Sequence, residues 1–236
     1  DGAVYQMHAE RLRQSLKAAG VTLTILTSEG GSSQEAKYRK ITGILAAPAS
    51  CERIVYLDAD TLVLDVEDIQ RVNGAWRIPW QIPVEGCLPK TLEPGLARER
   101  LKSFYRHYGL SAFEEGGNQE GVEWNSGVII GERSLMIALA QEWEVWWRRI
   151  LDLFDGHFRR DQLSFRIAYH HIINPRYPAG LPAEYNWIAS YFGINPNAHI
   201  LHRTMVRRVA WLEDAWERIA QRRLAGEPVR TANRYF

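Results

Sequence analysis

The chain has 236 residues, of which 46% are hydrophobic and 24% charged, a balance that is ordinary for a soluble globular protein. This length suffices for one large domain. The formal net charge is +1, so the field of the whole molecule gives no argument for nucleic-acid binding, and we expect no nucleic-acid partner. No apolar run reaches the length that spans a membrane.

Cysteine usage bears on the cellular compartment. The chain has two cysteines, Cys51 and Cys87, which can form one disulfide at most and therefore no disulfide framework. We expect a reducing compartment and a cytoplasmic location. The sequence is compatible with a homodimer but does not fix the oligomeric state.

The first sixty residues predict two helix–strand pairs. Residues 5–19 carry apolar side chains at helical spacing, and the β-branched run 21–26 that follows predicts a strand. A second helix is expected over 34–46. The run 53–57 is apolar or aromatic after its first residue, as in a central strand buried on both faces. Helix, strand, helix and strand in this order predict a parallel sheet with right-handed crossovers.

The rest of the chain alternates less regularly. Residues 76–84 are expected to be extended, because their two prolines exclude a helix. Further strands are predicted over 122–130 and 198–202. Four more helices are predicted, over 96–108, 133–153, 160–170 and 211–224. We therefore expect a single α/β domain over residues 1–236, with a Rossmann-like, mixed and mainly parallel sheet flanked by helices.

A pair of carboxylates follows the buried strand directly. Asp58 and Asp60 stand on either side of Ala59, where the chain leaves residues 53–57. Ligands of open α/β sheets bind at the carboxyl ends of strands. Two carboxylates one residue apart can converge there on one hard cation, Mn²⁺ or Mg²⁺. Such a cation suits a ligand whose diphosphate leaves with negative charge.

This motif has two alternatives. It is a solvated turn in many proteins, since aspartate is common in turns. A strand followed by Asp-x-Asp is also typical of phosphatases, but that motif requires Thr or Val four residues after the first aspartate, where this chain has Leu62.

The string IVYLDADTLVL resembles the metal-binding segment of GT-A-fold glycosyltransferases, particularly family 8, the group of glycogenin and bacterial galactosyltransferases. Other segments resemble the same family in the same order: residues 1–16, Lys40-Ile41, Trp124 to Val128, Asp161-Gln162, Leu181 to Asn186, and Ile200 to His202. Each segment alone is a weak signal. Together they are strong, because independent coincidences multiply. The resemblance spans roughly residues 1–203.

The resemblance implies a GT-A fold and a metal-dependent transfer of a sugar from a nucleotide-sugar, expected to be a UDP-sugar, with retention. The acceptor would be a sugar, a protein or a small molecule. Residues 1–82 would form the nucleotide- and metal-binding half, and residues 83–236 the acceptor-binding half with the C-terminal helix. Asp58, Asp60 and His202 would hold the metal.

The resemblance also implies roles for other residues. Catalytic roles fall to Gln162 beside the anomeric carbon, and to Asp161 and Asn125 on the sugar and acceptor hydroxyls. Donor binding would involve the three residues of the Asp58–Asp60 turn and six others: Tyr5 stacked on the base, Lys40, Ser126, Gly127, Asn186 and Arg203. Residues 83–121, between the metal strand and the Asn-Ser-Gly strand, are the expected acceptor-specific region.

Several of these residues have ordinary structural alternatives. Asp161 also suits the first turn of a helix, where the dipole favours an acid. Lys40 on a helix is usually just solvated. His199 competes with His202 for the metal; the two point to opposite faces of a strand, so at most one faces the site. We favour His202.

The chain departs from the family at two places. The sequence from Asp1 onward opens with the expected helix, without the strand that usually precedes it in the family. The family's Gly and Lys-Pro-Trp after the metal histidine are replaced here, and Arg203, Arg207 and Arg208 are candidates for the phosphate-binding role of that lysine. Because of these departures, two other functions remain as alternatives.

One is a nucleotidyltransferase that makes nucleotide-sugars, although the glycine-rich loop typical of that class is not found. The other is an inactive nucleotide-sugar-binding module.

Overall fold

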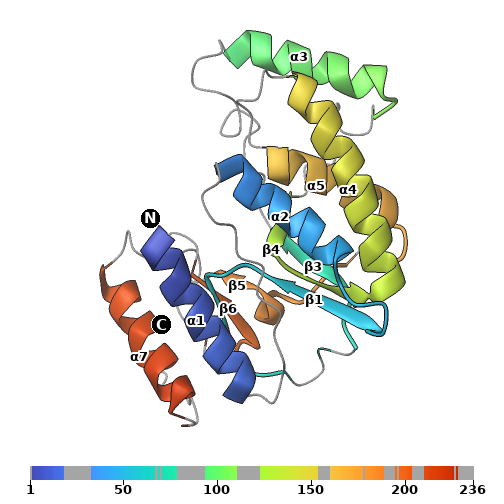
Figure 1. Cartoon of the computed structure of the whole chain (residues 1–236). Helices are drawn as coiled ribbons and strands as arrows, with labels where there is room; N and C mark the ends of the chain where they lie inside the picture. Colours follow the sequence, from blue (N-terminus) through green and yellow to red (C-terminus); the bar gives the residue numbers. More distant parts are fainter. Residues whose placement is uncertain are drawn as a thin grey trace.

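The computed structural model describes residues 2–18, 33–66, 69, 71–78, 94–110, 123–153, 160–177, 179–188, 195, 197–203, 210–225 and 227 (Figure 1). Their helices and strands are, in chain order, α1 (Gly2–Ala18), α2 (Ser33–Leu45), β1 (Arg53–Leu57), β2 (Thr61–Val63), β3 (Gly74–Ile78), α3 (Pro94–His107), β4 (Glu123–Glu132), α4 (Arg133–Leu153), α5 (Arg160–Ile172), the 3-10 helix η3 (Ala183–Tyr185), β5 (Trp187–Ile188), β6 (Ile200–His202) and α7 (Ala210–Leu224).

Strand β4 is the centre of one three-stranded sheet. It pairs antiparallel with β1, from Arg53 opposite Glu132 to Leu57 opposite Val128, and antiparallel with β3 on its other side. The second sheet has the order β2-β6-β5, in which β6 pairs antiparallel with β2 and parallel with β5. Since residues 58–60 connect β1 to β2, the predicted metal-binding turn lies between the two sheets.

Alternate residues of the β1–β4 sheet face two different cores. Ile54 and Ile129 belong to the core shared with helices α2 to α5, whereas Val128 and Ile130 belong to the core on the other face. Figure 1 shows α2, α4 and α5 above this sheet and α1 to its lower left, and Leu12 and Leu16 of α1 belong to the second core. Both faces are therefore covered, which explains why the run 53–57 has no polar alternation after its first residue.

Helix α4 carries the tryptophans at the centre of the first core. Trp143, Trp146 and Trp147 are all buried, as their helical spacing predicts. The Trp143 ring has no exposed surface, lies 4.7 Å from the Phe165 ring of α5 between centroids, and donates its Nε1–H to Ser164 Oγ at 2.9 Å. This contact holds α5 against α4. Asp161 and Gln162 lie in the first turn of α5.

Helices α1 and α7 lie side by side and bring the two ends of the described chain together (Figure 1). Arg11 of α1 and Glu217 of α7 form a two-pronged, part-buried ion pair, with Nη2 2.8 Å from Oε2. Trp216 of α7 packs in a third buried cluster with Leu62 and Leu201. The β2–β6 pair is thus supported by the C-terminal helix.

The mixed α/β architecture predicted from the sequence is confirmed, and most of the predicted helices and strands occur within a few residues of their expected bounds. The mainly parallel sheet is not found in the described part of the chain, where three of the four strand pairs are antiparallel. The strand predicted over 21–26 lies outside the described residues. An apolar run with helices on both faces suits a central strand of either direction, so burial alone did not decide the pairing.

None of the described helices combines the length and apolar character that a membrane crossing requires.

The first core makes a stability prediction. Trp143→Ala should lower the free energy of unfolding by about 3–5 kcal/mol, because it removes a large buried ring and leaves a cavity. Urea unfolding followed by circular dichroism measures the change. Val145→Ala on the same helix is the control; Val145 is exposed, so its loss should change stability by no more than about 0.5 kcal/mol. Equal effects of the two changes would contradict the packing described here.

Candidate metal centre

The Asp58–Asp60 turn is fixed by backbone hydrogen bonds at both ends. The Asp58 N–H donates to the Gly127 carbonyl at 2.7 Å, which extends the β1–β4 pairing by one residue. Both the N–H and the hydroxyl of Thr61 donate to the Asp58 carbonyl, at 3.1 and 2.8 Å. The turn is therefore closed by its own backbone, and its two carboxylates are left for other partners.

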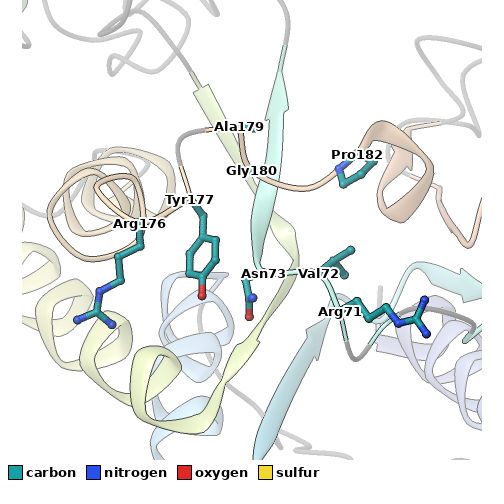
Figure 2. A pocket seen from close by; sticks show the side chains of 8 residues that line it. All are labelled: Arg71, Val72, Asn73, Arg176, Tyr177, Ala179, Gly180 and Pro182. Carbon is teal, nitrogen blue, oxygen red and sulfur yellow. The ribbon is translucent and has the colours of Figure 1, made fainter.

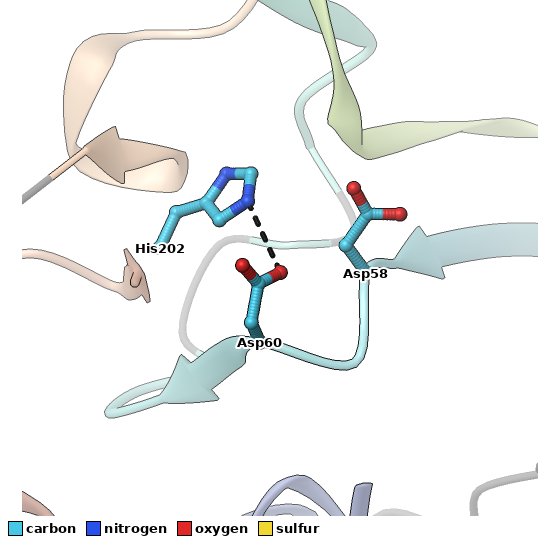
Figure 3. A group of neighbouring side chains, drawn as sticks. All are labelled: Asp58, Asp60 and His202. Carbon is cyan, nitrogen blue, oxygen red and sulfur yellow. Dashed lines mark ion pairs between the residues drawn. The ribbon is translucent and has the colours of Figure 1, made fainter. Parts of the chain in front are cut away.

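Strand β6 brings His202 to this turn. His202 is opposite Thr61 in the β2–β6 pair, and the Arg203 N–H donates to the Asp60 carbonyl at 2.8 Å. Figure 3 shows the His202 ring pointing toward Asp60, with Nε2 3.3 Å from Oδ1. One ligand atom from each of Asp58, Asp60 and His202 lies within 4.8 Å of the others. The three predicted metal ligands are therefore together in space.

The competing histidine points elsewhere. His199 stacks on the ring of Tyr185 at 4.5 Å between centroids, and its Nδ1 lies 3.4 Å from an Asp65 carboxylate oxygen. As predicted from the alternation of a strand, it faces away from the site that His202 faces.

The chemistry of the three ligands suits a divalent cation of the Mn²⁺ or Mg²⁺ kind. Their separations are no larger than about twice a metal–oxygen bond of 2.0–2.6 Å, the span of ligands around one ion. Burial favours the neutral form of Asp60, but the charge of His202, its hydrogen bond and the charge of Lys40 together lower the pKa of Asp60 to about 2. Asp60 is thus ionised at neutral pH.

Asp58 is held by two donors from different elements. Tyr56 OH donates to Oδ1 at 2.7 Å and Lys40 Nζ to Oδ2 at 2.9 Å. Burial lowers the pKa of Lys40, yet the charges of Asp58, Asp161 and Asp60 outweigh it and the net pKa is raised. Burial, together with the charge of Asp58, raises the pKa of the Tyr56 hydroxyl. Lys40 therefore stays charged and Tyr56 neutral, and each oxygen of Asp58 keeps a lone pair for a further partner.

A second group of polar side chains lies beside Lys40. Ser126 Oγ, fully buried on β4, accepts from Lys40 Nζ at 3.2 Å and from Gln162 Nε2 at 3.5 Å. Asp161 is buried at the start of α5, with Oδ1 3.3 Å from Lys37 Nζ. Gln162 Oε1 is buried and has no hydrogen-bond partner among the described residues. A buried carbonyl oxygen of this kind is a vacant acceptor for a ligand hydroxyl.

Asn125 and Asn186 lie behind His202, on the side away from Asp60. Asn125 Oδ1 accepts from the Gly127 N–H and from Asn186 Nδ2, both at 2.8 Å. Asn186 Oδ1 lies 2.9 Å from His202 Nδ1. Both amides were predicted to contact the donor, but in this structure they contact each other and the histidine.

Gly127 leaves room for the His202 ring. A Cβ placed on Gly127 would lie 2.2 Å from His202 Cε1 and 2.9 Å from its Nδ1. Such distances are far inside van der Waals contact, so only glycine fits here while the ring keeps its place. The space that a side chain at Gly127 would take is therefore filled by the His202 ring.

Of the remaining residues predicted to bind the donor, some lie near the turn and others lie outside the described part of the chain. Ala59 lies between the two aspartates in the turn. The Arg203 guanidinium reaches helix α1, where Nη1 lies 2.9 Å from Nε2 of the buried His8. Tyr5 belongs to α1, but its side chain lies outside the described part, as do Arg207 and Arg208 entirely.

Sequence reasoning missed two residues of the site. Tyr56 precedes Asp58 by two positions, and alternate residues of a strand share a face. Lys37 precedes Lys40 by three positions, and such residues are neighbours on a helix. Both spacings were available in the sequence, and Tyr56 stands within the string IVYLDADTLVL, but the resemblance assigned a role to neither residue.

A surface pocket of about 380 Å³ lies beside the start of β3 (Figure 2). It is lined by Arg71, Val72, Asn73, Arg176, Tyr177, Ala179, Gly180 and Pro182. Figure 2 shows the two arginine side chains diverging from each other, so they do not converge on one anion. Nothing in this pocket adds to the metal centre.

Comparison with known proteins yields little. No known protein family matches the sequence. No curated protein matches it significantly. Among solved structures, the apo form of mouse xyloside xylosyltransferase 1 is similar at 16% sequence identity and a TM-score of 0.39, covering 85% of this chain and 73% of that chain. A likeness this distant supports no conclusion about function, and the proposals below rest on the residues of this chain.

The contact between Gly127 and His202 makes a testable prediction. Gly127→Ala should destabilise the fold by about 1–3 kcal/mol, because the new methyl group displaces the buried ring. Gly131→Ala is the control on the same strand, where the added Cβ would meet the flexible Met136 side chain at 3.1 Å.

Urea unfolding of a double-mutant cycle identifies the cause. If the clash with His202 is responsible, Gly127→Ala should be much less destabilising when His202 is already alanine. An unchanged effect in that background would refute the clash.

Proposed function

We propose that this protein is a metal-dependent glycosyltransferase of the GT-A kind, which moves a sugar from a nucleotide-sugar to an acceptor. The observation that carries the proposal is the meeting of Asp58, Asp60 and His202 within 4.8 Å at the end of a strand. The first two were singled out by their position after strand residues 53–57, and the third by the resemblance to family 8. As that resemblance implies, we take the donor to be a UDP-sugar and the transfer to retain configuration.

The charge of the site supports a diphosphate ligand. Among the described residues, the carboxylates of Asp58, Asp60 and Asp161 lie beside two ammonium groups, those of Lys37 and Lys40, in addition to the ring of His202. A divalent cation held by Asp58, Asp60 and His202 would neutralise the diphosphate as the anomeric bond breaks. With the cation bound, the excess of negative charge becomes an excess of positive charge, which favours the departing diphosphate.

Lys40 has a part of its own in this proposal. Its ammonium bridges Asp58 and Ser126, and its raised pKa keeps it charged. It thereby fixes the Asp58 carboxylate toward the metal and places a positive charge beside the polar group of Ser126 and Gln162. Arg203 is proposed to supply a further cation to the phosphates, and Tyr5 to stack on the base.

The transferred sugar is proposed to lie over Gln162 and Asp161. The buried Gln162 Oε1 has no partner among the described residues, so it can accept a sugar hydroxyl and stabilise positive charge at the anomeric carbon. The Asp161 carboxylate, held by Lys37, can accept a further hydroxyl. No dedicated base is required, because the donor phosphate can take the acceptor proton.

The metal ligands make the first functional prediction. Wild-type protein should bind UDP in a Mn²⁺-dependent manner, and Asp60→Ala should weaken this binding by more than about 100-fold, because even indirect partners of a metal contribute 10–100-fold. Isothermal titration calorimetry with UDP and Mn²⁺ measures both. Asp65→Ala is the control, since Asp65 lies five residues on and faces His199. UDP binding that is equal with Mn²⁺ and with EDTA would sink the proposal.

The sugar contact makes a second prediction. Gln162→Ala should leave Mn²⁺-dependent UDP binding intact but slow the hydrolysis of the best-bound UDP-sugar by about 100-fold or more, the effect of removing one preorganised electrostatic group. A panel of UDP-sugars screened by thermal shift identifies the donor to use. Loss of UDP binding in this variant would place Gln162 at the nucleotide instead.

The products separate the two other functions. A nucleotidyltransferase would release pyrophosphate from UTP and a sugar phosphate, whereas a glycosyltransferase releases UDP from the nucleotide-sugar. An inactive module would bind the nucleotide-sugar with Mn²⁺ and release neither product.

A further inference from the structure

A chain of hydrogen bonds runs behind His202, from the backbone of β4 to the imidazole ring. It starts at the Gly127 N–H, passes through the amides of Asn125 and Asn186, and ends at His202 Nδ1, with each step 2.8 or 2.9 Å long. Asn186 has no exposed surface, and His202 is only 3% exposed. Because these groups are buried, each contact in the chain must join one hydrogen-bond donor to one acceptor.

The backbone fixes the direction of the whole chain. A peptide N–H can only donate, so the atom of Asn125 that faces Gly127 must be the carbonyl oxygen. That same oxygen also faces Asn186, which must therefore present its NH₂ group to it. The carbonyl oxygen of Asn186 is then left to face His202, and an acceptor there requires a proton on Nδ1.

A proton on Nδ1 determines the role of the other ring nitrogen of His202, Nε2. Since Nδ1 keeps its proton, the nitrogen that can give up a proton and offer its lone pair to a metal is Nε2, which lies 3.3 Å from Asp60. Either ring nitrogen of a histidine can bind a metal, and the hydrogen bond made by the other one decides which does. The close packing of Gly127 against Cε1 also opposes any reorientation of the ring.

We propose that Asn186 and Asn125 are positioning residues, which set the tautomer and orientation of His202 through the hydrogen-bond chain that begins at the Gly127 N–H. Their role is to present Nε2 to the cation rather than to hold the sugar. Burial favours this assignment, because Asn186 has no surface with which to meet a ligand and both ends of its amide are engaged. The inference rests on the proposed function for the presence of the cation, but the protonation of Nδ1 does not depend on it.

The first test is spectroscopic and needs no metal. Protein labelled with ¹⁵N-histidine has seven histidines, and long-range ¹H–¹⁵N spectra identify His202 by comparison with His202→Gln. We expect His202 Nδ1 to be protonated in the metal-free wild type, with a ring proton protected from exchange. An unprotonated Nδ1 in the wild type would overturn the proposal, whatever the variants do.

Variants test the role of each amide. Asn186→Leu and Asn125→Leu should lose the protected Nδ1 proton. Asn125→Asp should keep it, because a carboxylate accepts the same hydrogen bonds from Gly127 and Asn186. Retention of the proton in both leucine variants would overturn the proposal, and its presence in Asn125→Asp is the rescue that a merely structural role would not predict.

The second test measures metal affinity. Titration of Mn²⁺ alone, followed by electron paramagnetic resonance, should show that Asn186→Leu weakens binding by about 10–100-fold, the range for residues that orient a metal ligand. Asn197→Leu is the matched control, an exposed asparagine shortly before β6, and should bind Mn²⁺ as the wild type does. Thermal unfolding establishes that each variant is folded. Wild-type affinity in Asn186→Leu would overturn the proposal.

The two proposals fail in different ways. If the Nδ1 proton and the Mn²⁺ affinities are as expected but no nucleotide-sugar is bound, then the glycosyltransferase proposal fails and the positioning role stands. If UDP-sugar turnover depends on Mn²⁺ but Nδ1 is unprotonated, then the positioning role fails alone.

Discussion

The candidate site depends on the peptide of Gly127. Its carbonyl accepts from the Asp58 N–H and so fixes where the Asp58–Asp60 turn begins. Its N–H donates to Asn125, and its bare Cα is packed against the His202 ring. Gly127, in the middle of β4, thus contacts both the Asp58–Asp60 turn and His202. The geometry of the site follows from the antiparallel pairing of β1 with β4, because that pairing places Gly127 opposite the end of β1.

The charges around this peptide are arranged so that none is isolated. Lys40 is enclosed, yet its pKa is raised because the carboxylates around it outweigh the effect of burial. Asp58 has Tyr56 and Lys40, and Asp60 has His202. A buried charge without a partner would be strongly destabilising. Each of these charged groups in the described part of the chain therefore has a partner of opposite sign.

Much of this arrangement was predictable because it rests on local rules. The helix over 133–153 and the strand over 53–57 agree with the structure at both ends, since apolar periodicity and flanking residues define them. His202 was chosen over His199 by strand alternation together with the family resemblance, and the structure agrees. The direction of strand pairing was not predictable, because a strand covered on both faces has the same apolar pattern in either sheet type.

The contacts of Asn125 and Asn186 were beyond sequence reasoning for a different reason. Their residue type suits a sugar hydroxyl and a histidine equally well, and their contacts with each other and with His202 join segments that are far apart in the chain. Similarly, Arg203 was expected at the phosphates, but its contact with His8 depends on how α1 packs beside β6. Such contacts between distant segments are set by tertiary packing, which no local pattern encodes.

The pairing of β2 with β6 has a consequence for how the chain folds. These strands are separated by most of the chain, so their pairing closes a long loop and belongs among the slower contacts to form. Helices α2 to α5 and β4 can build their shared core over shorter sequence separations. A partly folded chain with that core complete would have the Asp58–Asp60 turn but not its histidine. Ligand binding at the complete site therefore acts on the fully folded state alone, and by mass action it stabilises that state over every partly folded one.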